Sequence, residues 1–347
     1  MPSFDYIIVG QGVAGSILDF TLRKNGLHGV VIDNGHKDAA SKVAAGVINP
    51  LTGRKYVKSW MIDELLPRAQ EIYGQLSKLI GVPLFHDRNI IRALHNIKEE
   101  NEWELKINSD ESKHFKAVTT DLDQYESVIN NAMSYGELQS GMQVHLPVLI
   151  KAYKQFLSKY KFIVEQEFNF DKLELHTDHV SYETLKAENI IFAEGYRVKS
   201  NPYFSHLAHE PSKGEALLIK IENCDPQKIL KQKLSFVPFG DGVFWVGSGY
   251  EWEFKDANPT DIEKEKMITI LDKNLKVPYK VIGHIAAIRP TVLDRRPFIG
   301  SHYNHKNVYI FNGFGTKGAS LVPYWAEHLM RHICFKEPIS PFVGLDR

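Results

Sequence analysis

Residues 5–34 read DYIIVGQGVAGSILDFTLRKNGLHGVVIDN, and this stretch decides the fold. Its continuous apolar run at 6–9 is typical of a strand that is buried on both faces of a sheet. Apolar residues then recur at helical spacing over 16–24, before an Asn-Gly pair ends the pattern. A second apolar run stops at Asp33. The order strand, glycine turn, helix, strand predicts a βαβ unit of a parallel sheet.

The turn of this unit has the spacing Gly-x-Gly-x-x-Gly. In this motif the first glycine permits a tight turn, the second lets the backbone approach a pyrophosphate, and the third lets the helix pack closely on the strand. The helix N-terminus adds unpaired N–H groups and a partial positive charge. An acid about twenty residues further on accepts hydrogen bonds from ribose hydroxyls and disfavours a 2′-phosphate. The candidate dinucleotide-binding residues are therefore Gly10, Gly12, Val13, Ala14, Gly15, Asp33 and Asn34.

Three further segments favour FAD over NAD as the dinucleotide. SKVAAGV at 41–47 is rich in small residues, which suits close approach to a flat ring. FAEG at 192–195 ends an apolar run in a small-residue turn, and NGFGTKGA at 312–319 is a glycine turn before a helix. Such a helix N-terminus can stabilise negative charge on a reduced flavin. These segments add the candidates Ser41, Ala44, Ala45, Gly46, Ala193, Gly195, Gly313, Gly315, Thr316, Lys317 and Gly318.

The composition limits the other classes of function. In 347 residues, 42 basic residues balance 42 acidic ones, which argues against nucleic acid as a partner. No apolar run approaches the roughly 20 residues of a membrane span. The two cysteines and 15 histidines show no metal-type spacing, so we expect no metal site and no disulfide framework. A reducing cytoplasm is the expected location.

The pattern beyond the first unit predicts alternating elements. We expect helices at 60–80, after Pro147 and at 319–333, and buried strands at 189–193 and 307–311. From 84 to 140 the sequence predicts short strands with polar connections. Residues 216–221 and 243–246 read as strands on either side of the turn at 240–242. Segments with the sequence pattern of a nucleotide-binding domain lie at both ends and in the middle of the chain. The domains are therefore expected to be interleaved.

The ordered motifs GxGxxG, SKVAAGV, FAEG, IRPTVLDRRPFIG and NGFGTKGASLVP resemble the D-amino-acid oxidase superfamily of flavoproteins. The resemblance spans nearly the whole chain. It implies an α/β (α+β overall) fold in which a Rossmann-like FAD-binding domain is interleaved with a substrate domain built on a large, mostly antiparallel sheet. The implied segments are 1–81, 141–210 and 289–347 for the FAD-binding domain, and 82–140 and 211–288 for the substrate domain.

The resemblance also implies roles for single residues. Ala45 and Gly46 fall where the backbone of the family passes the flavin N5 edge, and the turn from Gly313 to Gly318 falls at the pyrimidine end. Arg289 matches the arginine that grips the substrate carboxylate, a role suited to a bidentate donor that keeps its charge. Arg289 and Tyr250, a candidate for facing the substrate, are the catalytic candidates. The family places a tyrosine on the strand before the turn at 240–242, where this chain has Phe236.

Residues 49–60 depart from the best-known amino-acid oxidases. Their basic residues, Arg54, Lys55 and Lys58, either line the mouth of an active site that selects an acidic or extended substrate, or belong to a solvated loop.

The resulting hypothesis is an FAD-dependent oxidation of the C–N bond of an amino acid or related carboxylate-bearing amine. Hydride would pass to flavin N5, and the imine would then be hydrolysed. The alternatives are an FAD oxidase that modifies the wobble uridine of tRNA, a flavin-binding protein without turnover, and an NAD-dependent dehydrogenase. We expect the FAD to be non-covalent, because the IRP block has no cysteine and Val43 precedes the Ala-Ala-Gly turn. The electron acceptor, stereochemistry and oligomeric state stay open.

Overall fold

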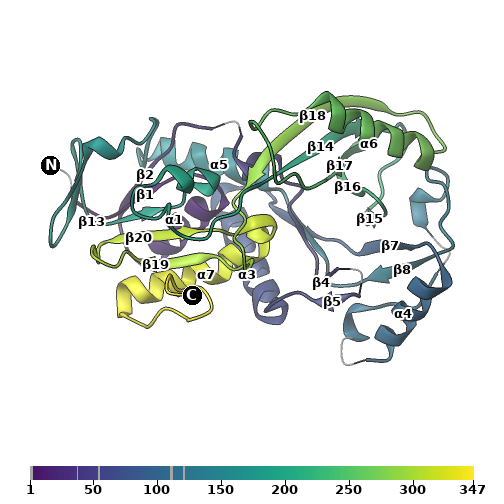
Figure 1. Cartoon of the computed structure of the whole chain (residues 1–347), viewed down its shortest axis with the longest axis horizontal. Helices are drawn as coiled ribbons and strands as arrows, with labels where there is room; N and C mark the ends of the chain where they lie inside the picture. The colour runs from purple at the N-terminus through teal and green to yellow at the C-terminus, as the bar shows by residue number, and fades with distance from the viewer. Residues whose placement is uncertain (1–2, 37, 54, 110–111, 120–121) are drawn as a thin grey trace.

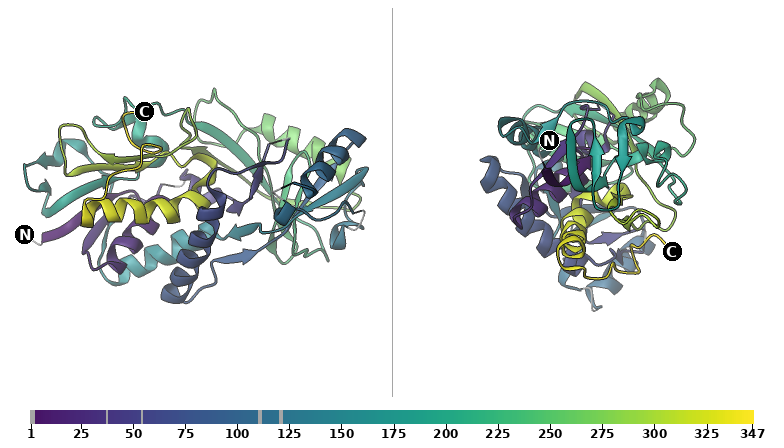
Figure 2. Two further views of the ribbon diagram at one scale, coloured as in Figure 1. Left: turned by 90° about the horizontal axis from the view of Figure 1, so that it is seen from below. Right: turned by 90° about the vertical axis from the view of Figure 1, so that its left-hand side faces the viewer.

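A computed structural model describes residues 3–36, 38–53, 55–109, 112–119 and 122–347. Two large β-sheets lie side by side along the long axis of the molecule (Figure 1). The first sheet holds both the N-terminal strand and the last strand of the chain. The second sheet holds strands from the middle of the sequence. The views in Figure 2 show the same two halves from below and from the end.

The first sheet is built around β1 (Ser3–Val9), which pairs in parallel with β2 (Gly29–Ile32) and β13 (Leu185–Phe192). The parallel strand β20 (Val308–Asn312) continues the sheet from β13. Its buried strands are apolar without alternation, as a sheet covered on both faces requires. The other strands of this sheet are β10 (Ile163–Val164), β11 (Leu173–Leu175), β12 (Val180–Tyr182) and β19 (Phe298–Ser301).

Four helices pack against one another and cover one face of the first sheet. They are α1 (Val13–Lys24), α3 (Ile62–Ile80), α5 (Leu146–Lys159) and α7 (Gly318–Phe335). The buried carboxylate of Asp19 fixes α1, because it accepts hydrogen bonds from the hydroxyls of Tyr6 and Tyr153 at 2.8 and 2.7 Å. The negative charge of Asp19 is compensated by an ion pair with Arg23 at 2.9 Å. This network joins β1, α1 and α5.

The second sheet has the strand order β18-β14-β17-β16-β15-β7-β8 and is antiparallel except between β15 and β7. Side chains alternate between its faces. One face carries Leu217, Phe236 and Val246, and the residues Met267 and Leu271 of α6 cover it. The other face turns toward the first sheet. The elements are β7 (Ile90–Leu94), β8 (Ser134–Leu138), β14 (Ser212–Lys220), β15 (Ile229–Lys231), β16 (Ser235–Gly240), β17 (Val243–Gly247), β18 (Lys280–Arg289) and α6 (Asp261–Asn274).

Smaller elements connect the two sheets. A three-stranded sheet joins β3 (Val47–Ile48), β9 (Met142–Val144) and β6 (Phe85–Asp87). The remaining elements are β4 (Leu51–Thr52), β5 (Val57–Lys58), α2 (Ala40–Val43), α4 (Ile97–Ile107) and the 3-10 turns Ser112–His114, Asp123–Tyr125, Phe170–Lys172, Gly195–Ser200 and Gly315–Lys317. No helix in the described ranges is both long and apolar enough to cross a bilayer.

The structure confirms the fold class and corrects several expected elements. Helices α4 and α6 stand where the sequence predicted only strands and connections, or no element. The turn at 240–242 joins β16 to β17, so the strand at 216–221 lies on the far side of β17 instead of across the turn. Phe236 points into the core beneath α6, because its neighbours on β16 occupy the opposite face.

The sheets draw on separate parts of the chain. Strands of the first sheet come from the N-terminal, central and C-terminal parts, and those of the second sheet from the two intervening parts. We therefore propose that 1–81, 141–210 and 289–347 form the FAD-binding domain. The substrate domain would then comprise 82–140 and 211–288. Strand β18 crosses the last of these boundaries by one residue, at Arg289.

Candidate active site

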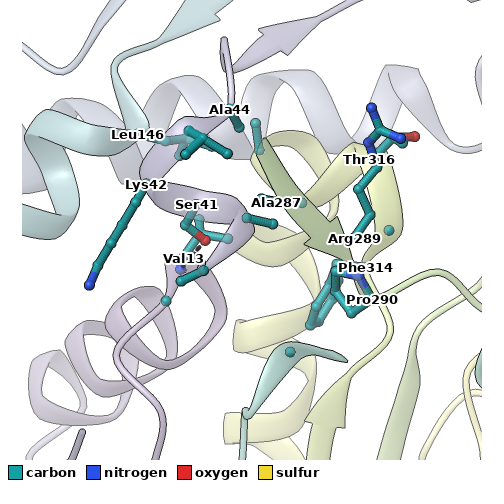
Figure 3. A pocket seen from close by; sticks show the side chains of 18 of the residues that line it. Val13, Ser41, Lys42, Ala44, Leu146, Ala287, Arg289, Pro290, Phe314 and Thr316 are labelled. Atoms are coloured by element: carbon teal, nitrogen blue, oxygen red, sulfur yellow. Dashed lines mark hydrogen bonds between the residues drawn. The ribbon is translucent and has the colours of Figure 1, made fainter. Parts of the chain in front are cut away.

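A cavity of about 760 Å³ lies between the two sheets. Its walls come from the first βαβ turn, the segment around α2, the end of β13, the turn before α7 and the facing side of the second sheet. In Figure 3, Val13 and Ser41 lie together on one side, and Arg289 extends from the end of a strand on the other. The volume lies within the range of cofactor and ligand sites.

The glycine turn forms the first wall of the cavity. Gly10 has φ +104°, and a Cβ there would stand 2.5 Å from the carbonyl oxygen of Ala193. A Cβ on Gly15 would stand 1.8 Å from the carbonyl oxygen of Gly10, so only glycine lets α1 pack this closely on β1. Gly12 is the N-cap of α1 and supplies no side-chain cap. The Ser41 hydroxyl instead accepts the first amide, from Val13, at 2.9 Å.

Asp33 stands at the end of β2 beside this turn. Its two carboxylate oxygens accept hydrogen bonds from the backbone amides of Gln11 and Gly35, at 2.8 and 2.6 Å. A carboxylate has about four lone-pair sites, so it can still accept bonds from a ligand diol. An open helix N-terminus beside a carboxylate that ends the next strand fits the pyrophosphate and ribose of FAD.

The middle of the cavity is bounded by small residues. Gly46 has φ +72°, and a Cβ there would stand 1.8 Å from the carbonyl oxygen of Val144. Across the cavity, the indole N–H of Trp245 donates to the carbonyl of Val43 at 2.9 Å, which ties the second sheet to the α2 segment. Burial lowers the pKa of the Lys317 ammonium group, and Arg295 adds to this shift. The small residues leave room for a flat ring system at this point.

Arg289 lies at the end of β18, on the face of the second sheet that lines the cavity. Its guanidinium donates to the Lys213 carbonyl at 3.2 Å, the Ser248 hydroxyl at 2.7 Å and the Gly249 carbonyl at 3.0 Å. The guanidinium carbon also stands 4.4 Å from the centre of the Tyr250 ring. All of these partners are uncharged groups. Burial lowers the pKa of Arg289, but an arginine in a protein keeps its charge.

Most candidates from the sequence line this one cavity, Arg289 and Tyr250 among them. Gly15 and Gly313 do not line it; they shape the turns behind it, and a Cβ on Gly313 would stand 2.6 Å from Val292. The lining residues named from the cofactor motifs are Gly10, Gly12, Val13, Ala14, Asp33, Asn34, Ser41, Ala44, Ala45, Gly46, Ala193, Gly195, Gly315, Thr316, Lys317 and Gly318.

Two of the basic residues of 49–60 can be placed relative to this cavity. Lys55 is exposed, Lys58 pairs with Asp63 at the surface, and Arg54 lies outside the described residues. Neither Lys55 nor Lys58 is among the residues that line the cavity, and a role for them at its mouth stays a prediction. From this segment the cavity is lined by Asn49, Thr52, Ser59 and Trp60.

Several lining residues were missed by the sequence analysis. Trp245, Ser248 and Lys231 come from the second sheet and the loop after β17, and Glu194 lies within the FAEG segment. Burial raises the pKa of the Glu194 carboxyl to about 7, against a hydrogen bond from the Asn201 amide at 2.7 Å. Alternation along β17, counted back from Gly247, would have placed Trp245 on the same face.

A dinucleotide cradle that faces a charged, mostly antiparallel sheet across one cavity defines a flavin-dependent oxidoreductase. The family described as FAD dependent oxidoreductase matches residues 5–331, and the chain belongs to this family. The protein is therefore an FAD-dependent enzyme, and its resemblance to the D-amino-acid oxidase superfamily is confirmed.

Known relatives match the whole chain. A glycine oxidase of Pseudomonas putida is 24% identical over 352 residues, which cover 96% of this chain and 95% of that protein. The crystal structure of glycine oxidase from Geobacillus kaustophilus superposes with a TM-score of 0.81 at 18% identity, covering 100% of this chain and 99% of the other. Iminodiacetate oxidase from Chelativorans sp. BNC1 superposes with a TM-score of 0.76 at 17% identity, covering 99% and 100%.

Proposed function

We propose that this enzyme oxidises the C–N bond of an amino acid or related amine that carries a carboxylate. The observation that carries the proposal is Arg289, a half-buried cation on the cavity wall whose partners in the described structure are neutral. Those hydrogen bonds use three of its five N–H groups, which leaves two for a ligand. An anion that reaches this guanidinium would compensate a charge that the protein leaves uncompensated.

The chain supplies orientation and charge for this reaction. When bound, FAD accepts the hydride that leaves the carbon bearing the amine. Arg289 would hold the carboxylate and so fix the direction in which that C–H bond points. An amine that binds deprotonated needs no side-chain base, and the imine product hydrolyses in water to a carbonyl compound and ammonia or an amine. The names of the relatives, glycine oxidase and iminodiacetate oxidase, agree with this class of substrate.

The test is stopped-flow reduction of the flavin without oxygen. The panel comprises glycine, N-methylglycine, D- and L-amino acids, iminodiacetate, and amines without a carboxylate. We expect carboxylate-bearing amines to reduce the flavin fastest. Arg289→Ala should raise the barrier by roughly 3–5 kcal/mol for the best of them, and Arg289→Lys by less, because lysine keeps the charge but loses the planar fork. Reduction by Arg289→Ala at the wild-type rate, or a best substrate without a carboxylate, would refute the proposal.

We also propose a cytoplasmic location, because Cys224 and Cys334 are both free thiols. Fractionation of the source cells tests this. Enrichment in a secreted or envelope fraction would contradict it.

A further inference from the structure

A row of paired residues crosses the cavity-facing side of the second sheet. Each member is the register partner of the next on the neighbouring strand. Four members are apolar or small and two are basic. From β18 to β7 the row reads Ile285, Ala216, Gly247, Ser235, Lys231 and Arg92. The floor of the cavity therefore runs from small side chains to Lys231, and Arg92 stands next to Lys231 in the sheet.

The two cations are an unfavourable pair by themselves. Lys231 on β15 and Arg92 on β7 are direct partners in a parallel ladder, and like charges in such positions repel. Lys231 lines the cavity, and burial lowers the pKa of its ammonium group, with a further contribution from the charge of Arg92. Within the described ranges no hydrogen bond or ion pair joins Lys231 to a carboxylate. Arg92 lies 5.6 Å from the centre of the Tyr56 ring.

The same sheet has a second like-charge pair, which differs from Lys231 and Arg92 in its exposure to water. Lys220 and Lys280 are partners at the other end of β14 and β18. Lys280 is exposed and Lys220 donates to the Asp241 carbonyl, so water screens this pair. The pair at Lys231 has less access to water and no such carbonyl partner in the described structure. An anion in the cavity would compensate its charge.

We propose that Lys231, backed by Arg92, binds a second acidic group of the substrate, so that the preferred substrates are amines with two acidic groups. This inference rests on the proposed function, because Arg289 holds the first carboxylate. Arg289 and Lys231 stand four strands apart in the order β18-β14-β17-β16-β15, which is roughly 19 Å across the sheet, and Arg289 lies four residues further along β18 than Ile285. Two long side chains span part of that distance. The acidic groups of the substrate therefore stand at opposite ends of an extended molecule.

The experiment measures ligand binding to the oxidised holoenzyme through the change in its flavin absorption spectrum. The probes are unreactive dicarboxylates of increasing length, from succinate to pimelate, and monocarboxylates of the same chain lengths. We expect at least one dicarboxylate to bind at least tenfold more tightly than its monocarboxylate partner. Lys231→Met should remove this advantage and leave the monocarboxylate Kd within twofold. Lys231→Gln serves as a second variant if Lys231→Met fails to fold.

Lys280→Met is the matched control, because it removes an exposed lysine from the same sheet, and it should keep the dicarboxylate advantage. Equal affinity for both acid series in the wild type would overturn the inference. So would an unchanged advantage in Lys231→Met, or loss of FAD from that variant. The proposed function fails separately, if Arg289→Ala leaves monocarboxylate affinity unchanged.

Discussion

At the scale of single residues, the shape of the cavity wall around Arg289 depends on the absence of a side chain at Gly214. Gly214 lies on β14 beside Arg289, and a Cβ there would stand 1.8 Å from a guanidinium nitrogen and 2.2 Å from the guanidinium carbon. The guanidinium can therefore approach the strand this closely only at a glycine. In that position it reaches Ser248 and Gly249 and meets the ring of Tyr250.

Gly214→Ala should displace the Arg289 guanidinium and weaken carboxylate binding about tenfold or more, with little effect on FAD retention. The reason is a contact far below van der Waals distance with a group that three hydrogen bonds hold in place. Titration of the oxidised enzyme with a simple carboxylate measures the loss. Gly74→Ala on α3 is the control, since nothing lies within 4 Å of a Cβ there. Wild-type carboxylate affinity in Gly214→Ala would show that the arginine accommodates the methyl group.

Asp33→Asn should weaken FAD binding by about 1.5–3 kcal/mol, because it removes the charge from an acceptor at the ribose position. Asparagine keeps one oxygen for Gln11 or Gly35, so the turn itself should persist. Titration of the apoprotein with FAD gives the affinity. Asp178→Asn, which alters a carboxylate 86% exposed on the surface, is the control. Equal FAD affinity in Asp33→Asn and Asp178→Asn would remove Asp33 from the cofactor site.

Local motifs could be recognised in the sequence, whereas positions set by register could not. Gly10, Gly12 and Asp33 are tied to one turn and one strand end, so their spacing carries the information. The place of Lys231 beside the cavity depends on its pairing with Arg92, which belongs to a strand far away in the sequence. No spacing within β15 could have revealed that.

At the scale of elements, the two long helices that the sequence did not predict, α4 and α6, have narrow apolar faces. Helix α4 buries only Trp103, and α6 buries only Met267 and Leu271. The rest of each helix is charged and polar, so the periodic signal is weak. A helix that contributes so few core residues looks like a polar connection in the sequence. The long helices α3 and α7 bury apolar residues along their whole length. Their helical periodicity could be recognised in the sequence for that reason.

The start of α6 is held by a buried ionic cluster on the outer face of the second sheet. Glu215 accepts hydrogen bonds from the Thr260 amide and hydroxyl at 2.8 and 3.1 Å. Lys213 pairs with the same carboxylate at 3.0 Å, and both side chains are almost fully buried. The hydroxyl of Thr260 also caps the helix by accepting the Glu263 amide at 3.3 Å.

Thr260→Val should lower the free energy of unfolding by about 1–2 kcal/mol, because it removes the cap and one of the hydrogen bonds to a buried carboxylate. Thr260→Ser keeps both interactions and should stay close to wild type. Urea unfolding of the holoenzyme compares the two variants. Equal stability of valine and serine at this position would mean that the cap contributes nothing measurable.

At the scale of the whole molecule, two chain crossings run side by side between the sheets. His209 and Val292 form a bridge, and the Glu210 amide donates to the Thr291 carbonyl at 2.8 Å. The His209 ring is buried against Phe298, and neither ring nitrogen has a hydrogen-bond partner in the described structure. Burial lowers its pKa to about 4.

The His209 pKa makes the stability of the protein sensitive to acid. The unfolded chain binds a proton near pH 6.5 and the folded chain only near 4, so stability present above pH 6.5 is lost as the pH falls toward 4. The slope is at most about 1.4 kcal/mol per pH unit. Glu194 acts in the opposite direction: burial raises its pKa to about 7, so its contribution is lost as the pH rises from about 4.5 to 7.

We expect His209→Phe to lose less stability than wild type between pH 6.5 and 4.5. Glu194→Gln should gain stability relative to wild type between pH 5 and 7.5. Urea unfolding of the apoprotein across this range gives the difference curves, in which groups common to all three proteins cancel. A His209→Phe curve parallel to that of wild type would mean that the ring has the same pKa in the folded and the unfolded protein.

The interleaved first sheet has a consequence for biosynthesis. Strand β1 leaves the ribosome some 180 residues before its neighbour β13, and β20 and α7 follow later still. A growing chain therefore has the glycine turn long before it has the walls that face it. Translation must pass α7 before all the described walls of the cradle exist. We therefore expect the coenzyme to be captured only after α7 has been made, so that its supply governs how much of the translated protein becomes active and does not govern how much is made.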